Sequence, residues 1–145
     1  MRPPPLYSDS GYTDVLFEYL GADSTCAMDA SAYEGADILH DLNLPVHGSL
    51  FGSFDTVFDG GTLEHVFNFP VAISNVQRML KNGLFISVNG ANNFLGHGFY
   101  QFSPELMWRA FSTGFIIEMM QLCAITGQVP DPSGIPSFLK RKKST

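Results

Sequence analysis

The order of apolar and polar residues divides most of the chain into short strands and helices. Apolar side chains recur at helical spacing over residues 12–20, where Gly21 is a natural terminator. They recur again over residues 70–80, where the cation, breaker and glycine at residues 81–83 are interpreted as the helix stop. A further helix is predicted from Ser103, an N-cap followed by a proline and an acid, to about residue 111. Short apolar or alternating runs, which are typical of strands, cover residues 25–29, 36–42, 54–59, 84–88 and 115–122.

This order of elements predicts a single α/β domain. A helix is followed by three strands, and from there helices and strands alternate. Such an order favours a mostly parallel sheet with helices on both faces. We expect the domain to cover residues 11–126, after a proline-rich extended segment at residues 1–10 and before an irregular, basic tail at residues 127–145.

Charge and composition exclude several classes of function. The net charge is −6, and four of the eight basic residues lie together at 140–143, so the body of the chain is acidic and repels a phosphate backbone. No apolar run approaches the length of a membrane span, and the proline-rich start lacks the apolar core of a signal peptide. The two cysteines lie far apart, as in a reduced protein. We therefore expect a cytoplasmic protein that binds neither nucleic acid nor membrane.

The stretch from residue 54 to residue 70 carries candidate chemistry. An alternating strand ends at Asp59, Gly60 and Gly61 permit a sharp turn, and Glu64 and His65 follow. Open α/β sheets form their sites at the carboxyl ends of their strands, where these side chains would lie. Asp59 is the best candidate for facing a cationic group, and Glu64 and His65 can serve as acid and base. Alternatively, Glu64 is a first-turn acid and His65 a partly buried spacer.

A second candidate site is the loop at residues 89–105. It holds three asparagines, four aromatic rings and a histidine, His97, between Gly96 and Gly98. Loops of this kind usually carry recognition, so we take His97 as a candidate base and Tyr100, with a neighbouring asparagine, as a candidate orienting group. Alternatively, the aromatic rings pack the loop down over the sheet. The four histidines form no i, i+4 pair, so no metal site is predicted.

Four short stretches follow one another in an order and spacing that are hard to obtain by chance. They are Cys26-Ala27-Met28-Asp29, Asp41-Leu42-Asn43, Phe54-Asp55-Thr56-Val57-Phe58-Asp59 with Leu63-Glu64-His65-Val66, and Arg78-Met79-Leu80-Lys81-Asn82-Gly83-Leu84-Phe85. Together they resemble the class I S-adenosylmethionine-dependent methyltransferases. The last stretch is similar to that family's Arg-x-Leu-Lys-Pro-Gly-Gly turn, with Asn82 in place of the proline and Leu84 in place of the second glycine.

The resemblance implies a Rossmann-like sheet that binds S-adenosylmethionine and methylates an acceptor, here an unknown small molecule or glycan-like compound. In the family, the acid that ends the second strand holds the ribose hydroxyls, and it corresponds to Asp29. The residues after the third strand contact the adenine, and they correspond to Asp41, Leu42 and Asn43. The turn of Asp59, Gly60 and Gly61 is then the candidate for the cationic end of the cofactor. The candidate catalytic residues are His97, Glu64, His65 and Tyr100.

The chain departs from the family at its start. The family's first strand and glycine-rich loop have no counterpart before Cys26, so we expect a truncated domain. The first strand lies between the second and the fourth, and its removal exposes two strand edges that pair or aggregate unless covered. We therefore predict that those two strands close up or that a second copy fills the gap, with a homodimer preferred. The rival interpretation is a catalytically inactive, methyltransferase-like scaffold whose aromatic surface binds protein.

Overall fold

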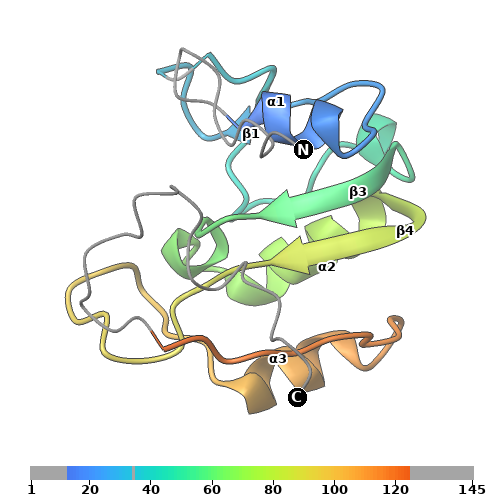
Figure 1. Ribbon diagram of the computed structural model, residues 1–145. Coiled ribbons are helices and arrows are strands. Elements are labelled where there is room, and N and C mark those ends of the chain that lie inside the picture. The colour runs from blue at the N-terminus through green and yellow to red at the C-terminus, as the bar shows by residue number, and fades with distance from the viewer. Residues whose placement is uncertain (1–12, 34, 125–145) are drawn as a thin grey trace, which may run out of the picture.

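The longest helix, α2 (Phe69–Met79), lies at the centre of the core. The computed structural model describes residues 13–33 and 35–124 (Figure 1). Pro70 lies in the first turn of α2, and the backbone becomes extended at Leu80, which ends the helix. The predicted helix at residues 70–80 is therefore confirmed. The buried apolar cluster around it consists of Leu63, Val66, Phe69, Ala72, Ile73, Val76, Phe102 and Phe111.

Strands β3 (Phe54–Asp59) and β4 (Leu80–Ser87) form a parallel pair connected through α2 (Figure 1). Asp59 is the register partner of Ser87, so both strands end at the same rim. β4 begins earlier than predicted, and the interpretation of residues 81–83 as a helix stop was wrong. Gly83 explains the difference, because a Cβ there would lie 1.9 Å from the carbonyl oxygen of Asp55. Only glycine permits so close an approach of two strands.

The two faces of the β3–β4 sheet are covered unequally. On one face, Val57 and Phe85 pack against the core cluster, and the Phe85 ring lies 4.8 Å from that of Phe111 in α3 (Pro104–Phe111). On the other face, Phe58 is 45 % exposed although its ring contacts Phe17 of α1 (Asp14–Tyr19) at 5.2 Å. We call this second side the open face; it carries Phe58, Leu84, Ile86 and Val88, all exposed. Among the described helices, α1 is the one that contacts this face.

Strands β1 (Met28–Asp29) and β2 (Ile38–Leu39) form a second parallel pair. Both were predicted, but each is only two residues long. Their surroundings are mostly exposed, so little apolar burial supports longer strands. Within residues 13–33 and 35–124, β1 does not pair with β3. The expectation of one continuous sheet was therefore wrong for the described residues, and the predicted closing up of the strands at residues 25–29 and 54–59 is not seen there. An α/β chain with parallel strand pairs is confirmed.

Helices α1 and α3 match the two other predicted helices. After α1, Gly21 has φ +100° and its N–H donates to the Glu18 carbonyl at 3.0 Å, as expected of a helix terminator. Ser103 caps α3 by accepting the N–H of Leu106 at 3.2 Å. Two short 3₁₀ helices, η1 (Gly48–Leu50) and η2 (Leu63–His65), complete the described elements.

The predicted strand at residues 115–122 was wrong, because that segment is irregular. Burial does alternate at its start, because Phe115 and Ile117 pack against the core while Ile116 is 90 % exposed. Among the described residues, however, no strand pairs with it. None of the helices described is both long and apolar enough to cross a bilayer. The segment predicted at residues 1–10 and the tail at 127–145 lie outside the described residues.

Candidate functional site

Asp59 joins the ends of β3 and β4 to the start of η2. Asp59 is 5 % exposed, and its Oδ1 accepts hydrogen bonds from the backbone N–H groups of Thr62 at 2.9 Å and Leu63 at 3.1 Å. Its Oδ2 accepts from the Ser87 hydroxyl at 2.8 Å and the Asn89 amide at 2.6 Å. Both carboxylate oxygens are therefore engaged by the chain itself. Asp59 organises the rim of the sheet, and it is not part of the cavity wall described below.

Glu64, in η2, is a buried acid with an unpaired oxygen. Its side chain is 4 % exposed, and its Oε1 lies 3.6 Å from Nε2 of His97. The other oxygen, Oε2, has no hydrogen-bond partner in the described part of the chain. Gly61 lies against this carboxylate with φ +99°, and a Cβ there would lie 3.2 Å from Oε1. The absence of a side chain at Gly61 thus makes room for Glu64.

The backbone of the His97 loop (residues 90–102) binds the main chain of Glu64. The N–H groups of Phe99 and Tyr100 both donate to the Glu64 carbonyl, at 2.7 and 3.2 Å. Gly98 has φ +68°, and a Cβ there would lie 2.8 Å from the same carbonyl oxygen. A glycine is therefore required where the loop meets η2. This contact brings His97 over Glu64.

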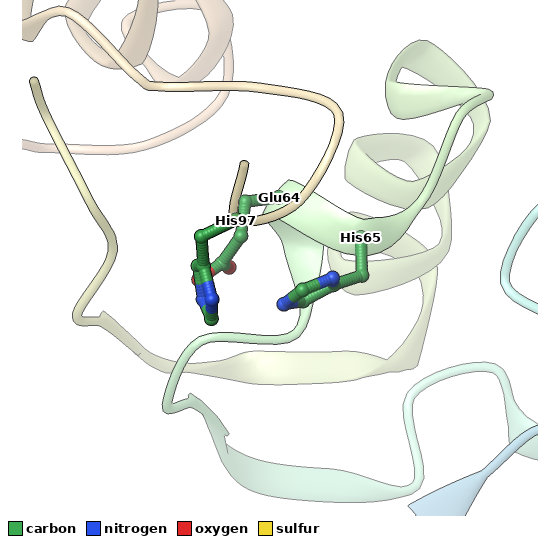
Figure 2. A group of neighbouring side chains, drawn as sticks. All are labelled: Glu64, His65 and His97. Atoms are coloured by element: carbon green, nitrogen blue, oxygen red, sulfur yellow. The ribbon is translucent and has the colours of Figure 1, made fainter. Parts of the chain in front are cut away.

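Three of the four candidate catalytic side chains come together in this way (Figure 2). One ligand-type atom each from Glu64, His65 and His97 lies within 4.8 Å of the other two. The two imidazole rings are 4.7 Å apart and meet edge to face. Tyr100, the fourth candidate, does not join them: its hydroxyl donates to the Phe67 carbonyl at 2.6 Å, and its ring stacks on Phe102.

A cavity of about 200 Å³ opens beside this cluster at the ends of β1 and β2. It brings together Asp29, Asp41, Leu42 and Asn43, the residues predicted for the ribose and the adenine. His65 belongs both to the cavity wall and to the cluster of Glu64, His65 and His97. The complete lining is Met28, Asp29, Ala30, His40, Asp41, Leu42, Asn43, Thr62, His65 and Val66, which does not include Gly60 or Gly61.

Hydrogen bonds shape the polar side of the cavity. The carboxylate of Asp41 accepts the backbone N–H of Asn43 at 2.9 Å and its side-chain amide at 2.7 Å, and these bonds, the backbone bond first, lower the pKa of Asp41. Asn43 in turn accepts the N–H of Asn68 at 2.8 Å, just before α2. Asp41 is therefore held as an exposed anion in a fixed position.

Sequence reasoning missed several residues that support the site. Asn75 of α2 is buried and bonds the backbone of the segment that follows Asp41. His40 lines the cavity, and its ring bonds the Leu44 carbonyl at 3.0 Å. A signal existed for Asn75, which is a polar residue on the apolar side of a helix. No spacing rule could have found the cluster of Glu64, His65 and His97, because His97 lies far along the chain from the other two.

No family model, curated protein or solved structure matches this chain.

Proposed function

We propose that the chain binds S-adenosylmethionine in the cavity at the ends of β1 and β2 and methylates a small-molecule or glycan-like acceptor. The cavity wall is the observation that carries this proposal. Asp29, Asp41, Leu42 and Asn43, assigned to the cofactor from a sequence resemblance alone, line a single cavity although they follow two different strands. Ligands of open α/β sheets bind at the carboxyl ends of strands, which supports the same position.

The lining groups fit the nucleoside part of this cofactor. Oδ1 of Asp29 accepts the N–H of Ser31 at 2.6 Å, and its other oxygen has no hydrogen-bond partner among the described residues. It is therefore free to accept from a ribose hydroxyl. Met28, Leu42 and Val66 supply apolar surface for a base. The volume of about 200 Å³ is below the ~300–1,000 Å³ of typical small-molecule pockets, so the cavity encloses only part of the cofactor.

The cofactor, when bound, supplies a methyl group on a sulfonium, and the chain must orient the acceptor and accept its proton. His65 and His97 are suited to the proton transfer because imidazole titrates near neutral pH. Glu64, 3.6 Å from His97, orients that ring and stabilises the imidazolium that forms when it takes a proton. Since His65 also lines the cavity, the acceptor is expected at the mouth that the cavity and the cluster share.

Calorimetry with S-adenosylhomocysteine and the purified full chain tests this function. Asp29→Asn removes the charge at nearly constant size, and Asp23→Asn, an exposed position outside the cavity, is the matched control. We expect saturable micromolar binding that Asp29→Asn weakens about tenfold or more, because a hydrogen bond to a charged group contributes about 1.5–3 kcal/mol. Asp23→Asn should leave the affinity unchanged. Absence of binding at millimolar ligand would exclude the proposed activity.

One observation favours a second candidate function, an inactive methyltransferase-like module that binds protein. The open face of the β3–β4 sheet presents Phe58, Leu84, Ile86 and Val88 as adjoining exposed apolar side chains. Apolar surface of this kind often marks a protein contact. A chain that binds no S-adenosylhomocysteine, yet associates through this face, would fit the second candidate.

A further inference from the structure

Glu64, His65 and His97 bring one carboxylate and two imidazoles to one place (Figure 2). The first two residues belong to η2, and His97 arrives from its loop through the backbone contact with Glu64. These are donors that transition metals take from proteins, since imidazole suits zinc, copper, iron and nickel, and a carboxylate adds charge.

The state of Glu64 points to a missing partner. Its side chain is 4 % exposed, its Oε2 has no hydrogen-bond partner among residues 13–33 and 35–124, and the 3.6 Å contact of Oε1 with His97 exceeds hydrogen-bond length. A carboxylate buried in this way is unfavourable unless it is paired or coordinates a metal. The unsatisfied Oε2 of this buried acid and the two imidazoles beside the carboxylate therefore point to a cation.

We propose that Glu64, His65 and His97 form a binding site for a divalent transition-metal ion, with Zn²⁺ as the preferred ion. Two histidines and one glutamate are a known ligand set of catalytic zinc sites, in which a fourth position stays open. With zinc–ligand bonds of about 2.0–2.2 Å, tetrahedral coordination separates ligand atoms by about 3.4 Å. Nε2 of His97 and Oε1 of Glu64, at 3.6 Å, are already close to this separation.

The remaining decrease in the distances between ligand atoms would come from movement of the two histidine side chains. All three ligand atoms lie within 4.8 Å of one another, and both histidines are exposed, so small ring rotations close the triad. The buried Glu64 is the fixed member, since Gly61 and Gly98 pack against it. An imidazole nitrogen that ligates zinc cannot also accept a proton, so the zinc-bound form is distinct from the arrangement proposed for methyl transfer. The metal site needs only these three donors and does not depend on binding of a nucleoside cofactor.

Zinc titration of the full chain, freed of any affinity tag, tests the site. The chain should carry Cys26→Ser and Cys123→Ser, because both thiols are exposed and bind zinc themselves. Competition with a chromophoric chelator measures the affinity, and the visible absorption of bound Co²⁺ reports the coordination geometry. The ligand variants are Glu64→Gln, His65→Ala and His97→Ala.

A matched control is His47→Asn. His47 lies outside the cluster, and its side chain caps η1 by accepting the N–H of Ser49 at 3.2 Å, which asparagine can also do. This variant removes a histidine without removing a ligand. If Glu64→Gln does not fold, the two exposed histidines decide the test, because neither is needed for the core.

We expect one zinc ion per chain, bound at micromolar concentration or tighter. Each ligand variant should weaken zinc binding by more than about a hundredfold, beyond the ~10–100-fold typical of losing an outer-shell partner, and His47→Asn should change the affinity little. Co²⁺ should show the intense absorption of four- or five-coordinate sites. The proposal is overturned if zinc does not saturate below about 100 μM, which is an affinity of only about 5.5 kcal/mol, or if the ligand variants bind as tightly as the parent chain.

Discussion

Asn75 allows the support of the candidate cavity to be tested quantitatively. The residue is 1 % exposed on the apolar side of α2. Its Oδ1 accepts the N–H of Val46 at 2.9 Å, and its Nδ2 donates to the carbonyls of Leu44 at 2.8 Å and Leu42 at 3.3 Å. One side chain therefore fixes the segment at residues 42–46, which continues the cavity wall, onto the core helix.

The perturbation is Asn75→Ala. It removes three hydrogen bonds, each worth a net of about 1 kcal/mol. It also leaves the N–H of Val46, a residue 4 % exposed, without an acceptor. We therefore expect the free energy of unfolding to fall by about 3–4 kcal/mol. Because small domains have about 5–15 kcal/mol of stability, the variant should still fold.

Urea unfolding followed by circular dichroism measures this change. Asn92→Ala is the matched control, since Asn92 is exposed and has no side-chain hydrogen bond among the described residues; it should change stability by no more than about 0.5 kcal/mol. Asn75→Asp keeps the acceptor for Val46 but faces a carboxylate toward two carbonyls, and should destabilise at least as much. A loss below about 1 kcal/mol for Asn75→Ala would refute the reasoning.

Three further predictions concern the His97 loop, the pKa of Asp41 and the oligomeric state of the chain. Gly98→Ala should open the His97 loop and weaken zinc binding at least tenfold, because its Cβ would lie 2.8 Å from the Glu64 carbonyl oxygen. Gly96→Ala, at φ +80° but in open space, should cost only about 1–2 kcal/mol of backbone strain. Asn43→Ala should raise the pKa of Asp41 part of the way to its ordinary value in an NMR titration, since one of its two Asn43 donors is lost. Light scattering after gel filtration should give a dimer, because the open face of the β3–β4 sheet is apolar.

Each of these predictions has a result that contradicts it. Equal effects of Gly98→Ala and Gly96→Ala would show that the close approach to Glu64 is unimportant. An unchanged pKa of Asp41 in Asn43→Ala would show that the side-chain amide of Asn43 does not stabilise the Asp41 carboxylate. Folding lowers the pKa of Asp41, so its hydrogen bonds with Asn43 stabilise the folded state at pH values above the pKa of this group in the unfolded chain. That stabilisation is lost as the pH falls through the pKa of Asp41 in the folded chain. A monomer at micromolar concentration would contradict the dimer.

The fold was predictable where local signals were strong and failed where distant contacts decided. The periodicity of α2 and the Ser103 cap of α3 are local, and both helices begin and end close to the predicted residues. Asn82 and Gly83 looked like a helix stop, but the close approach of Asp55 turns them into the beginning of a strand. At residues 115–122 an apolar run favoured a strand, but a strand also needs a neighbouring edge, and none pairs with this segment among the described residues.

The candidate site shows the same division. The family resemblance pointed to Asp29 and Asp41, whereas a strand end and neighbouring glycines pointed to Glu64 and His97. The structure brings the first two into a cavity and the last two into contact. The internal bonding of Asp59 was not visible in the sequence, because its donors come from four different residues. The metal-ligand cluster was missed because the i, i+4 criterion detects only donors on one helix.

The double hydrogen bond on the Glu64 carbonyl makes two backbone amides natural reporters of the site. The N–H groups of Phe99 and Tyr100 can exchange with solvent only when the loop lifts from η2, and the same motion carries His97 away from Glu64. Local opening and loss of the cluster are therefore one event with one free energy. Any ligand that binds the closed arrangement must slow hydrogen exchange at these two amides, even if it touches neither residue. Occupancy can thus be measured from the main chain before the ligand is identified.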